Sequence, residues 1–322
     1  MKRYALNALA AIVLFTLTFS ALAQTYPTRP VRMITPFAPG GGTDISARIL
    51  AEALGKILGH TVVVDNRPGA GSVVGTDLAA KASPDGYTLL LGNISMAFNA
   101  ALYRKLPYDT IRDFTPISLV TDQPNMLVAH PSLPAKTLGA FVALAQSQPG
   151  KLSYGSAGTG SGTHLAMELL LMSQKIDLVH VPFKGTGPAL TAMLGNQISV
   201  FFSTYASALP HVKADRLRAF AVTSAKRTTT LPEVPTVAES GVPGYQYSTW
   251  YGLLAPADVS RPILDKLSKA TVAVLETAEV KERYLAQGMD PVPTTPAVFA
   301  QLIRSEIAKW GKVVRTAKIP LQ

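Results

Sequence analysis

The sequence contains no cysteine among its 322 residues. This absence excludes disulfide bonds, thiolate metal sites and a lipid anchor on cysteine. The five histidines, at positions 60, 130, 164, 180 and 211, are widely spaced and form no H-E-x-x-H pair. No P-loop or complete G-x-G-x-x-G motif occurs either. We therefore expect structural histidines, no bound metal and no cofactor.

Long apolar runs are also scarce. Beyond the N-terminus, no stretch approaches the roughly 18 unbroken apolar residues of a membrane span. At the N-terminus, Lys2 and Arg3 precede an apolar region from Ala8 to Phe19, and Ala21-Leu22-Ala23 forms a small-residue cleavage site. This pattern predicts a secretory signal peptide over residues 1–23, cleaved after Ala23. We expect a soluble protein exported to the periplasm.

Charged residues make up only 16% of the chain against 48% hydrophobic residues, which predicts a sizeable buried core and no extensive disorder. The formal charge is +10, and it falls to +8 when residues 1–23, with two basic and no acidic side chains, are removed. The basic residues are scattered, and the mature chain has no basic run longer than Lys226-Arg227. We therefore expect attraction for small anions, and no nucleic-acid partner.

Glycine and proline, in contrast, gather in Pro36–Asp44, between a short strand-forming run (Val31–Thr35) and a helical apolar pattern that reaches Leu58. A glycine-rich loop at a helix start offers unpaired N–H groups and a positive dipole end, which together suit a phosphate or carboxylate. The alternative is an ordinary turn with Thr43 or Asp44 as N-cap. The candidate ligand contacts in this loop are Phe37, Ala38, Pro39, Gly40, Gly41, Thr43 and Asp44.

Strand patterns begin near residues 31, 61 and 87, with helical patterns between them. This alternation is typical of βαβ units on a parallel sheet, where ligands bind at the carboxyl ends of the strands. Ser95 follows the third strand at that edge and is a further candidate contact.

A second α/β unit follows the extended segment Asn125–Ala129. The chain becomes extended again at Tyr247–Leu254 and ends in helices, including a long one over residues 296–314. Two crossings predict a hinged pair of lobes with a cleft between them. We expect residues 24–123 and 248–322 to form the first lobe and residues 124–247 the second.

The second unit has its own glycine-rich loop, Gly155–Gly162, directly before a helix. If the lobes face each other, both loops line one cleft and hold an anion with amides and hydroxyls. The alternative is a flexible surface loop. The candidate contacts here are Ser156, Gly158, Thr159, Ser161 and His164.

Ser161 and His164 also permit a serine hydrolase interpretation. A nucleophile elbow needs G-x-S-x-G, however, and Thr159 stands where its first glycine should be. No acid is placed by the sequence to orient His164. We keep the hydrolase as the alternative to a binding protein.

The roles of five positions are ambiguous. Lys184 is either a solvated loop lysine or a source of charge at the cleft. Tyr205, like Trp250 and Tyr251, either lines the cleft or packs in the core. Asp44 is either an N-cap or a partner for an amino group of the ligand.

Taken together, the ordered segments resemble the extracytoplasmic solute receptors of tripartite tricarboxylate transporters, the Bug-type periplasmic binding proteins. The matching segments run through the whole mature chain. They are residues 26–32 (YPTRPVR), 36–44 (PFAPGGGTD), 66–71 (NRPGAG), 84–90 (PDGYTLL), 154–158 (YGSAG) continuing to His164, 181–185 (VPFKG), 217–222 (LRAFAV) and 250–257 (WYGLLAPA).

The resemblance implies an α/β, two-lobed type II periplasmic binding fold, each lobe a mainly parallel sheet flanked by helices. It also implies a non-enzymatic, monomeric receptor that closes on a dicarboxylate, tricarboxylate or aromatic acid and presents it to a two-component membrane permease. A ligand-sensing role in signalling is a further alternative. Relatives often carry an aspartate where this chain has Ser203, and this difference favours an uncharged or aromatic distal group near Tyr205.

Overall fold

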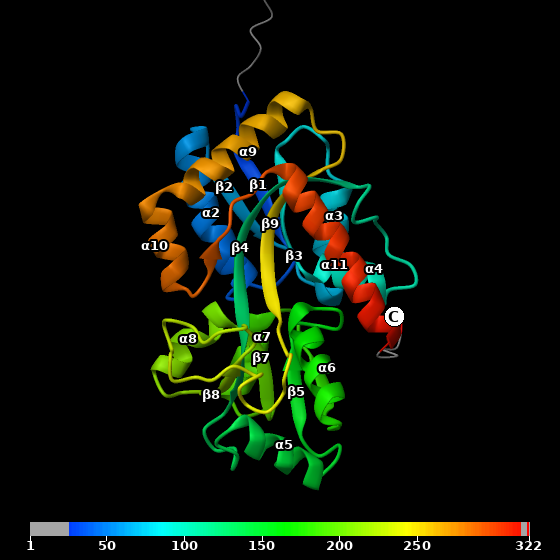
Figure 1. The fold of residues 1–322 in the computed structure, drawn as a ribbon. Coiled ribbons are helices and arrows are strands. Elements are labelled where there is room, and N and C mark those ends of the chain that lie inside the picture. The colour runs from blue at the N-terminus through cyan, green and yellow to red at the C-terminus, as the bar shows by residue number, and fades with distance from the viewer. Residues whose placement is uncertain (1–25, 317–320, 322) are drawn as a thin grey trace, which may run out of the picture.

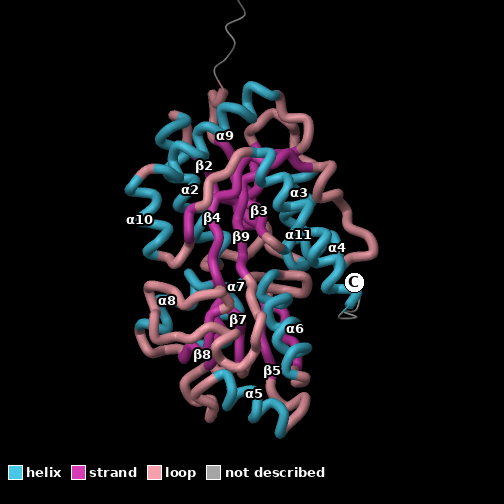
Figure 2. Tube along the Cα trace, in the orientation of Figure 1, coloured by secondary structure: helices cyan, strands magenta, loops and turns pink. Residues whose placement is uncertain are grey.

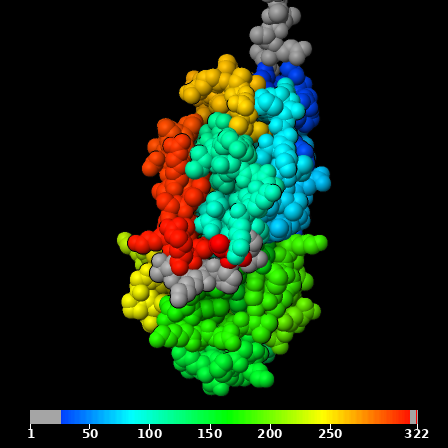
Figure 3. All heavy atoms as spheres, turned by 90° about the vertical axis from the view of Figure 1, so that its right-hand side faces the viewer, coloured from blue at the N-terminus to red at the C-terminus, as the bar shows by residue number. Residues whose placement is uncertain are grey.

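The computed structural model describes residues 26–316 and residue 321, so the expected signal peptide lies outside the described residues. The described chain forms two lobes stacked end to end (Figure 1). On the face shown in Figure 3, the two lobes lie in contact. Among the described helices, none is both long and apolar enough to cross a membrane.

The sheet of the first lobe has a parallel part and an antiparallel part. β1 (Val31–Thr35) lies between β2 (Val62–Asn66) and β3 (Thr88–Asn93), and all three are parallel. β9 (Ser248–Pro256) pairs antiparallel with β3, and β4 (Phe114–Ala129) pairs antiparallel with β9. The three parallel strands are those expected from the sequence near residues 31, 61 and 87, and the short β10 (Asp290–Pro291) adds to β4.

Helices cover both faces of this sheet (Figure 1). One layer holds α2, α9 and α10, and its core includes Leu50, Leu54, Leu267 and Tyr284. The other holds α3, α4 and α11, where the Phe98 and Trp310 rings meet edge to face at 6.5 Å. The helices are α2 (Gly42–Leu58), α3 (Val73–Ala80), α4 (Ser95–Leu102), α9 (Arg261–Glu276), α10 (Ala278–Ala286) and α11 (Pro296–Thr316), with a short 3-10 turn (Ala70–Ser72) before α3.

The second lobe repeats the layered design. β5 (Ser153–Ser156) lies between β6 (Val179–Pro182) and β7 (Val200–Thr204), parallel to both. β8 (Arg218–Val222) pairs antiparallel with the end of β4. The helices are α5 (Leu138–Ser147), α6 (Gly162–Gln174), α7 (Thr186–Leu194) and α8 (Tyr205–Lys213).

β4 and β9 carry the chain between the lobes (Figure 2). β4 pairs with β9 up to Pro124, opposite Ser248, and pairs with β7 from Asn125, opposite Thr204. The extended segment Asn125–Ala129, expected from the sequence, is therefore the end of one strand of 16 residues. This continuity lets the lobes share one sheet while their other strands stay separate.

Candidate functional site

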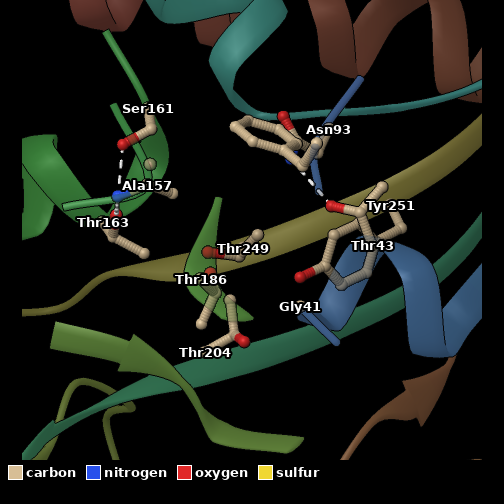
Figure 4. Close-up of a pocket in the computed structure, with 12 residues that line it drawn as sticks. Gly41, Thr43, Asn93, Ala157, Ser161, Thr163, Thr186, Thr204, Thr249 and Tyr251 are labelled. Atoms are coloured by element: carbon tan, nitrogen blue, oxygen red, sulfur yellow. Dashed lines mark hydrogen bonds between the residues drawn. The ribbon is translucent and has the colours of Figure 1, made fainter. Parts of the chain in front are cut away.

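A small cavity lies between the lobes, where both glycine-rich loops end (Figure 4). In Figure 4, Asn93, Thr43 and Tyr251 gather on one side and Ser161, Thr163 and Ala157 on the other. The cavity is lined by Phe37, Gly41, Thr43, Asn93, Ala157, Ser161, Gly162, Thr163, Thr186, Thr204, Thr249 and Tyr251.

Four helices begin at this cavity. Gly41 and Ser161 are the N-caps of α2 and α6, Thr204 is the N-cap of α8, and Thr186 is the first residue of α7. In α2 the first N–H to reach a helical carbonyl is that of Ile45, which donates to Gly41 at 3.0 Å. In α6 it is that of Leu165, which donates to Ser161 at 3.0 Å. The amides of Thr43 and Thr163 precede these bonds, so the cavity receives unpaired donors and four positive dipole ends.

The lining contains no Asp, Glu, Lys, Arg or His. Its polarity comes from hydroxyl groups, from the Asn93 amide and from the backbone. Within the described residues, no group of three or more acidic or histidine side chains could hold a metal ion. The arrangement suits an anion held by neutral donors.

Hydrogen bonds tie the lobes together around the cavity. The Ala38 N–H donates to the Lys184 carbonyl at 3.1 Å, and the Gly42 N–H donates to Thr204 Oγ1 at 3.2 Å. The Gly162 N–H donates to Ser95 Oγ at 3.1 Å. The lobes are therefore closed, with backbone from each lobe within bonding distance of the other.

Close backbone approach also requires glycine at position 71. Gly71 has a φ of +57°, and a Cβ there would overlap the Thr159 carbonyl across the interface. Only glycine meets both conditions without strain.

Asp44 braces the first loop from behind. Its carboxylate accepts hydrogen bonds from the Gly40 N–H and from Asn66 Nδ2, both at 3.0 Å, and pairs with Arg48. Burial opposes its ionisation, but the hydrogen bonds from Arg48, Gly40 and Asn66 outweigh burial and hold the pKa of Asp44 below its usual value. The carboxylate is thus ionised and used within the loop.

Histidines brace the second loop. Ser156 Oγ lies 2.6 Å from His180 Nε2, and the His180 ring stacks on the His164 ring at 4.4 Å. Burial lowers the pKa of each histidine to about 4, and for His180 the nearby His164 acts in the same direction. Both rings are therefore neutral at pH 7.

The expected site residues fall into three groups. Phe37, Gly41, Thr43 and Ser161 line the cavity. A second group lies at the interface between the lobes or supports the loops, one layer from the cavity. It comprises Ala38, Pro39, Gly40, Asp44, Ser95, Ser156, Gly158, Thr159 and His164.

Three expected residues direct their side chains elsewhere. The Lys184 side chain is exposed, and only its carbonyl joins the interface. Tyr205 packs in the core of the second lobe, where its hydroxyl bonds Thr228 at 2.7 Å and Thr230 at 2.6 Å. Ser203 is buried and donates to the Thr204 carbonyl at 3.1 Å. Neither Ser203 nor Tyr205 is a lining residue, so the geometry does not support a distal-group role for them.

Seven lining residues were not considered as contacts from the sequence, and an eighth, Tyr251, was left open between cleft and core. Six lie close in sequence to expected ones, since they follow a strand or start a helix near a proposed loop; the other two are on β9. They are Asn93, Ala157, Gly162, Thr163, Thr186, Thr204, Thr249 and Tyr251. Four of them, Gly162, Thr163, Thr186 and Thr204, lie at a helix start or one residue from it, and this position is a signal that the sequence offers.

The pair proposed for a hydrolase is arranged as a helix cap. Ser161 Oγ accepts a hydrogen bond from the His164 backbone N–H at 3.3 Å. The His164 ring instead accepts from the Gly160 N–H and lies 3.6 Å from Glu168. The hydrogen bond between these residues thus runs from the His164 backbone to the Ser161 hydroxyl, and none joins the ring to the hydroxyl that it would need to activate.

Comparison with known proteins agrees with this geometry. Residues 46–319 match the model of the tripartite tricarboxylate transporter family receptor. Protein BugT of Bordetella pertussis is 40% identical over 295 residues, 91% of this chain and 90% of that protein.

Two solved structures are also similar over their full length. R. palustris Rpa4515 with adipate has a TM-score of 0.89 at 32% identity and covers 92% of this chain. MatC (Rpa3494) from Rhodopseudomonas palustris with bound malate has a TM-score of 0.86 at 36% identity and covers 90%. The chain belongs to the tripartite tricarboxylate transporter receptor family, a family of solute-binding receptors and not of enzymes.

Proposed function

We propose that this protein is a periplasmic receptor that captures a small organic carboxylate between its lobes and delivers it to a membrane permease. The observation that carries the proposal is the convergence of four helix N-termini on a cavity whose lining has no charged side chain. Such a cavity favours a negative ligand and offers no counter-charge to a cation.

Neutral donors supply enough free energy for this task. A hydrogen bond to a charged group contributes about 1.5–3 kcal/mol, and a helix start contributes up to about 2 kcal/mol. A few such contacts, from Thr43 and Thr163 for example, offset the cost of removing a carboxylate from water without any arginine.

The two relatives with a bound ligand narrow the chemical class of the proposed ligand. One structure contains adipate and the other malate, both dicarboxylates. We extend this class to the present chain, whose cavity presents hydroxyl groups and helix-start amides from both lobes.

Delivery requires closure and export. We propose that residues 24–123 with 248–322 move against residues 124–247 about the β4 and β9 crossings, and that the closed form docks on the permease as a monomer. Residues 1–23 would direct export, with cleavage after Ala23. Sensing for a signalling system would use the same closure.

The test is a calorimetric titration of the purified protein with malate, adipate, citrate and benzoate, each beside its fully amidated analogue. We expect one acid to bind stoichiometrically and its neutral amide to bind at least tenfold more weakly. Equal binding of acid and amide, or no binding of any acid, would contradict a carboxylate receptor. Native mass spectrometry before the titration would show whether an acid is already retained.

A further inference from the structure

Two side-chain amides, that of Asn93 in the cavity lining and that of Gln123 beside Tyr251, have fixed orientations. Asn93 Oδ1 accepts a hydrogen bond from the Ser95 backbone N–H at 3.0 Å. A backbone N–H can only donate, so the atom facing it must be the amide oxygen. Asn93 Nδ2 is then directed to Thr43 Oγ1, 3.3 Å away, where it donates.

Gln123 is fixed in the same way. Its Oε1 accepts from the Ala206 backbone N–H at 3.2 Å, which leaves Nε2 to donate to the Tyr251 hydroxyl oxygen at 2.6 Å. Gln123 and Tyr251 are both buried, with 1% and 0% exposed. Gln123 lies on β4, Tyr251 on β9 and Ala206 on α8, so this contact joins both crossings to a helix of the second lobe.

The orientations of Asn93 and Gln123 constrain the protons of the Thr43 and Tyr251 hydroxyl groups. Burial raises the pKa of Tyr251 well above its usual value, although hydrogen bonding with Gln123 and Thr43 acts in the opposite direction, and the phenol keeps its proton. Its oxygen already accepts from Gln123, and Thr43 Oγ1 already accepts from Asn93.

Among the hydrogen bonds between described residues, none takes the proton of either hydroxyl. If one of these hydroxyls donates to the other, the second still has a free proton. At least one proton is therefore available to a group in the cavity, which both residues line.

We propose that Gln123 is a positioning residue for Tyr251, as Asn93 is for Thr43, and that the free hydroxyl proton at this end of the cavity selects a strong hydrogen-bond acceptor in the ligand. An ionised carboxylate is such a group. A carboxamide or a protonated acid can offer its carbonyl oxygen there, but this neutral oxygen accepts a weaker hydrogen bond than an ionised carboxylate does. This inference rests on the proposed carboxylate receptor and assigns its selectivity to named residues.

Gln123→Glu tests the inference because it keeps the side-chain size and reverses one bond. A carboxylate at position 123 accepts both from the Ala206 N–H and from the Tyr251 O–H, which turns the phenol proton away from the cavity. Tyr251→Phe removes the proton altogether. Gln197→Glu, at an exposed position, and Tyr205→Phe, whose hydroxyl bonds outside the cavity, are the matched controls.

The readout is calorimetric affinity for the panel acid that binds the unmodified protein best, and for its monoamide. We expect Tyr251→Phe to lose at least about tenfold in acid affinity and less in amide affinity. Gln123→Glu should lose more, and its preference for acid over amide should fall at least about tenfold. In the Tyr251→Phe background, Gln123→Glu should change this preference by less than it does alone, because its action passes through the phenol.

Three results would overturn the inference. The first is acid affinity within twofold of the unmodified protein for both variants. The second is an equal loss for acid and amide, which would mark a merely structural role. The third is that no panel acid binds the unmodified protein, and only this result also removes the proposed function.

Discussion

The two glycine-rich loops place the same chemistry on opposite sides of one cavity, yet they are supported in opposite ways. Behind the first loop, the ionised Asp44 accepts from Gly40 and Asn66 and pairs with Arg48. Behind the second, Ser161 caps α6 and the neutral rings of His164 and His180 stack on each other. The lining between them carries no charged side chain.

This difference shows what the site requires and what it leaves free. Both loops must present helix-start amides, but the support behind them can be ionic or neutral, because that charge never reaches the ligand. Variants can therefore separate changes in the cavity lining from changes in the groups behind either loop, which are Asp44 for the first loop and His164 and His180 for the second.

The largest effect on binding is expected for a change in the cavity lining itself. In Gly41→Val the new side chain projects toward Thr186, since even a Cβ at Gly41 would lie 3.3 Å from Thr186 Cβ. Closure then loses several interlobe bonds, and we expect a loss of acid affinity of roughly a hundredfold. Calorimetry measures it. Gly139→Val, where a Cβ meets nothing within 4 Å, is the control and should bind normally.

The next largest effect concerns the stability that the ionised Asp44 contributes behind the first loop. Asp44→Asn replaces an acceptor by an amide that faces the Gly40, Asn66 and Arg48 donors, so we expect a stability loss of about 1–3 kcal/mol in urea unfolding. Asp65→Asn, which disrupts a part-buried pair with Arg32 and an exposed pair with Arg67, should cost at most about 1 kcal/mol. Equal losses in the two variants would show that Asp44 is not a special support.

The two neutral histidines behind the second loop should make the protein less stable in acid. Folding lowers the pKa of His164 and His180 to about 4 from a usual value of 6.5. Between these values the unfolded chain binds more protons, so the stabilising effect is complete above pH 6.5 and is lost as pH falls towards 4. As pH falls through this window, each histidine should raise the equilibrium constant for unfolding by up to about tenfold per pH unit.

Urea unfolding at pH 7, 6, 5 and 4.5 checks this dependence. The double variant His164→Gln and His180→Gln should lack most of it, while His130→Gln, away from the second loop, should retain it. An unchanged pH profile in the double variant would assign the acid sensitivity to other groups.

The smallest effect is expected at Lys184. Its side chain is exposed and only its carbonyl contacts Ala38, so Lys184→Ala should keep acid affinity within twofold. A loss above tenfold in calorimetry would mean that lysine charge does contribute at the cleft.

The sequence predicts the fold well because its signals are local. The strands near residues 31, 61 and 87 and the helix starts at both glycine loops follow from periodicity and composition. The short α10 and β10 are less predictable, since nine and two residues carry little pattern.

The site is only partly predictable because its residues meet through closure. Thr186, Thr204 and Thr249 lie on separate elements, and no local pattern links them. Tyr205 shows the opposite case, a residue that the sequence suggested for the cleft and that lies in the core. It follows the N-cap Thr204 by one residue, and this single step turns its side chain into the core of the second lobe.

The central claim is that helix-start amides and hydroxyls, and no cationic side chain, hold the ligand's carboxylate. A crystal structure with the acid that binds best tests it most directly. We expect carboxylate oxygens within about 3 Å of the Thr43 and Thr163 amides, between the two loops. A carboxylate paired with a lysine or arginine, or bound outside this cavity, would contradict it.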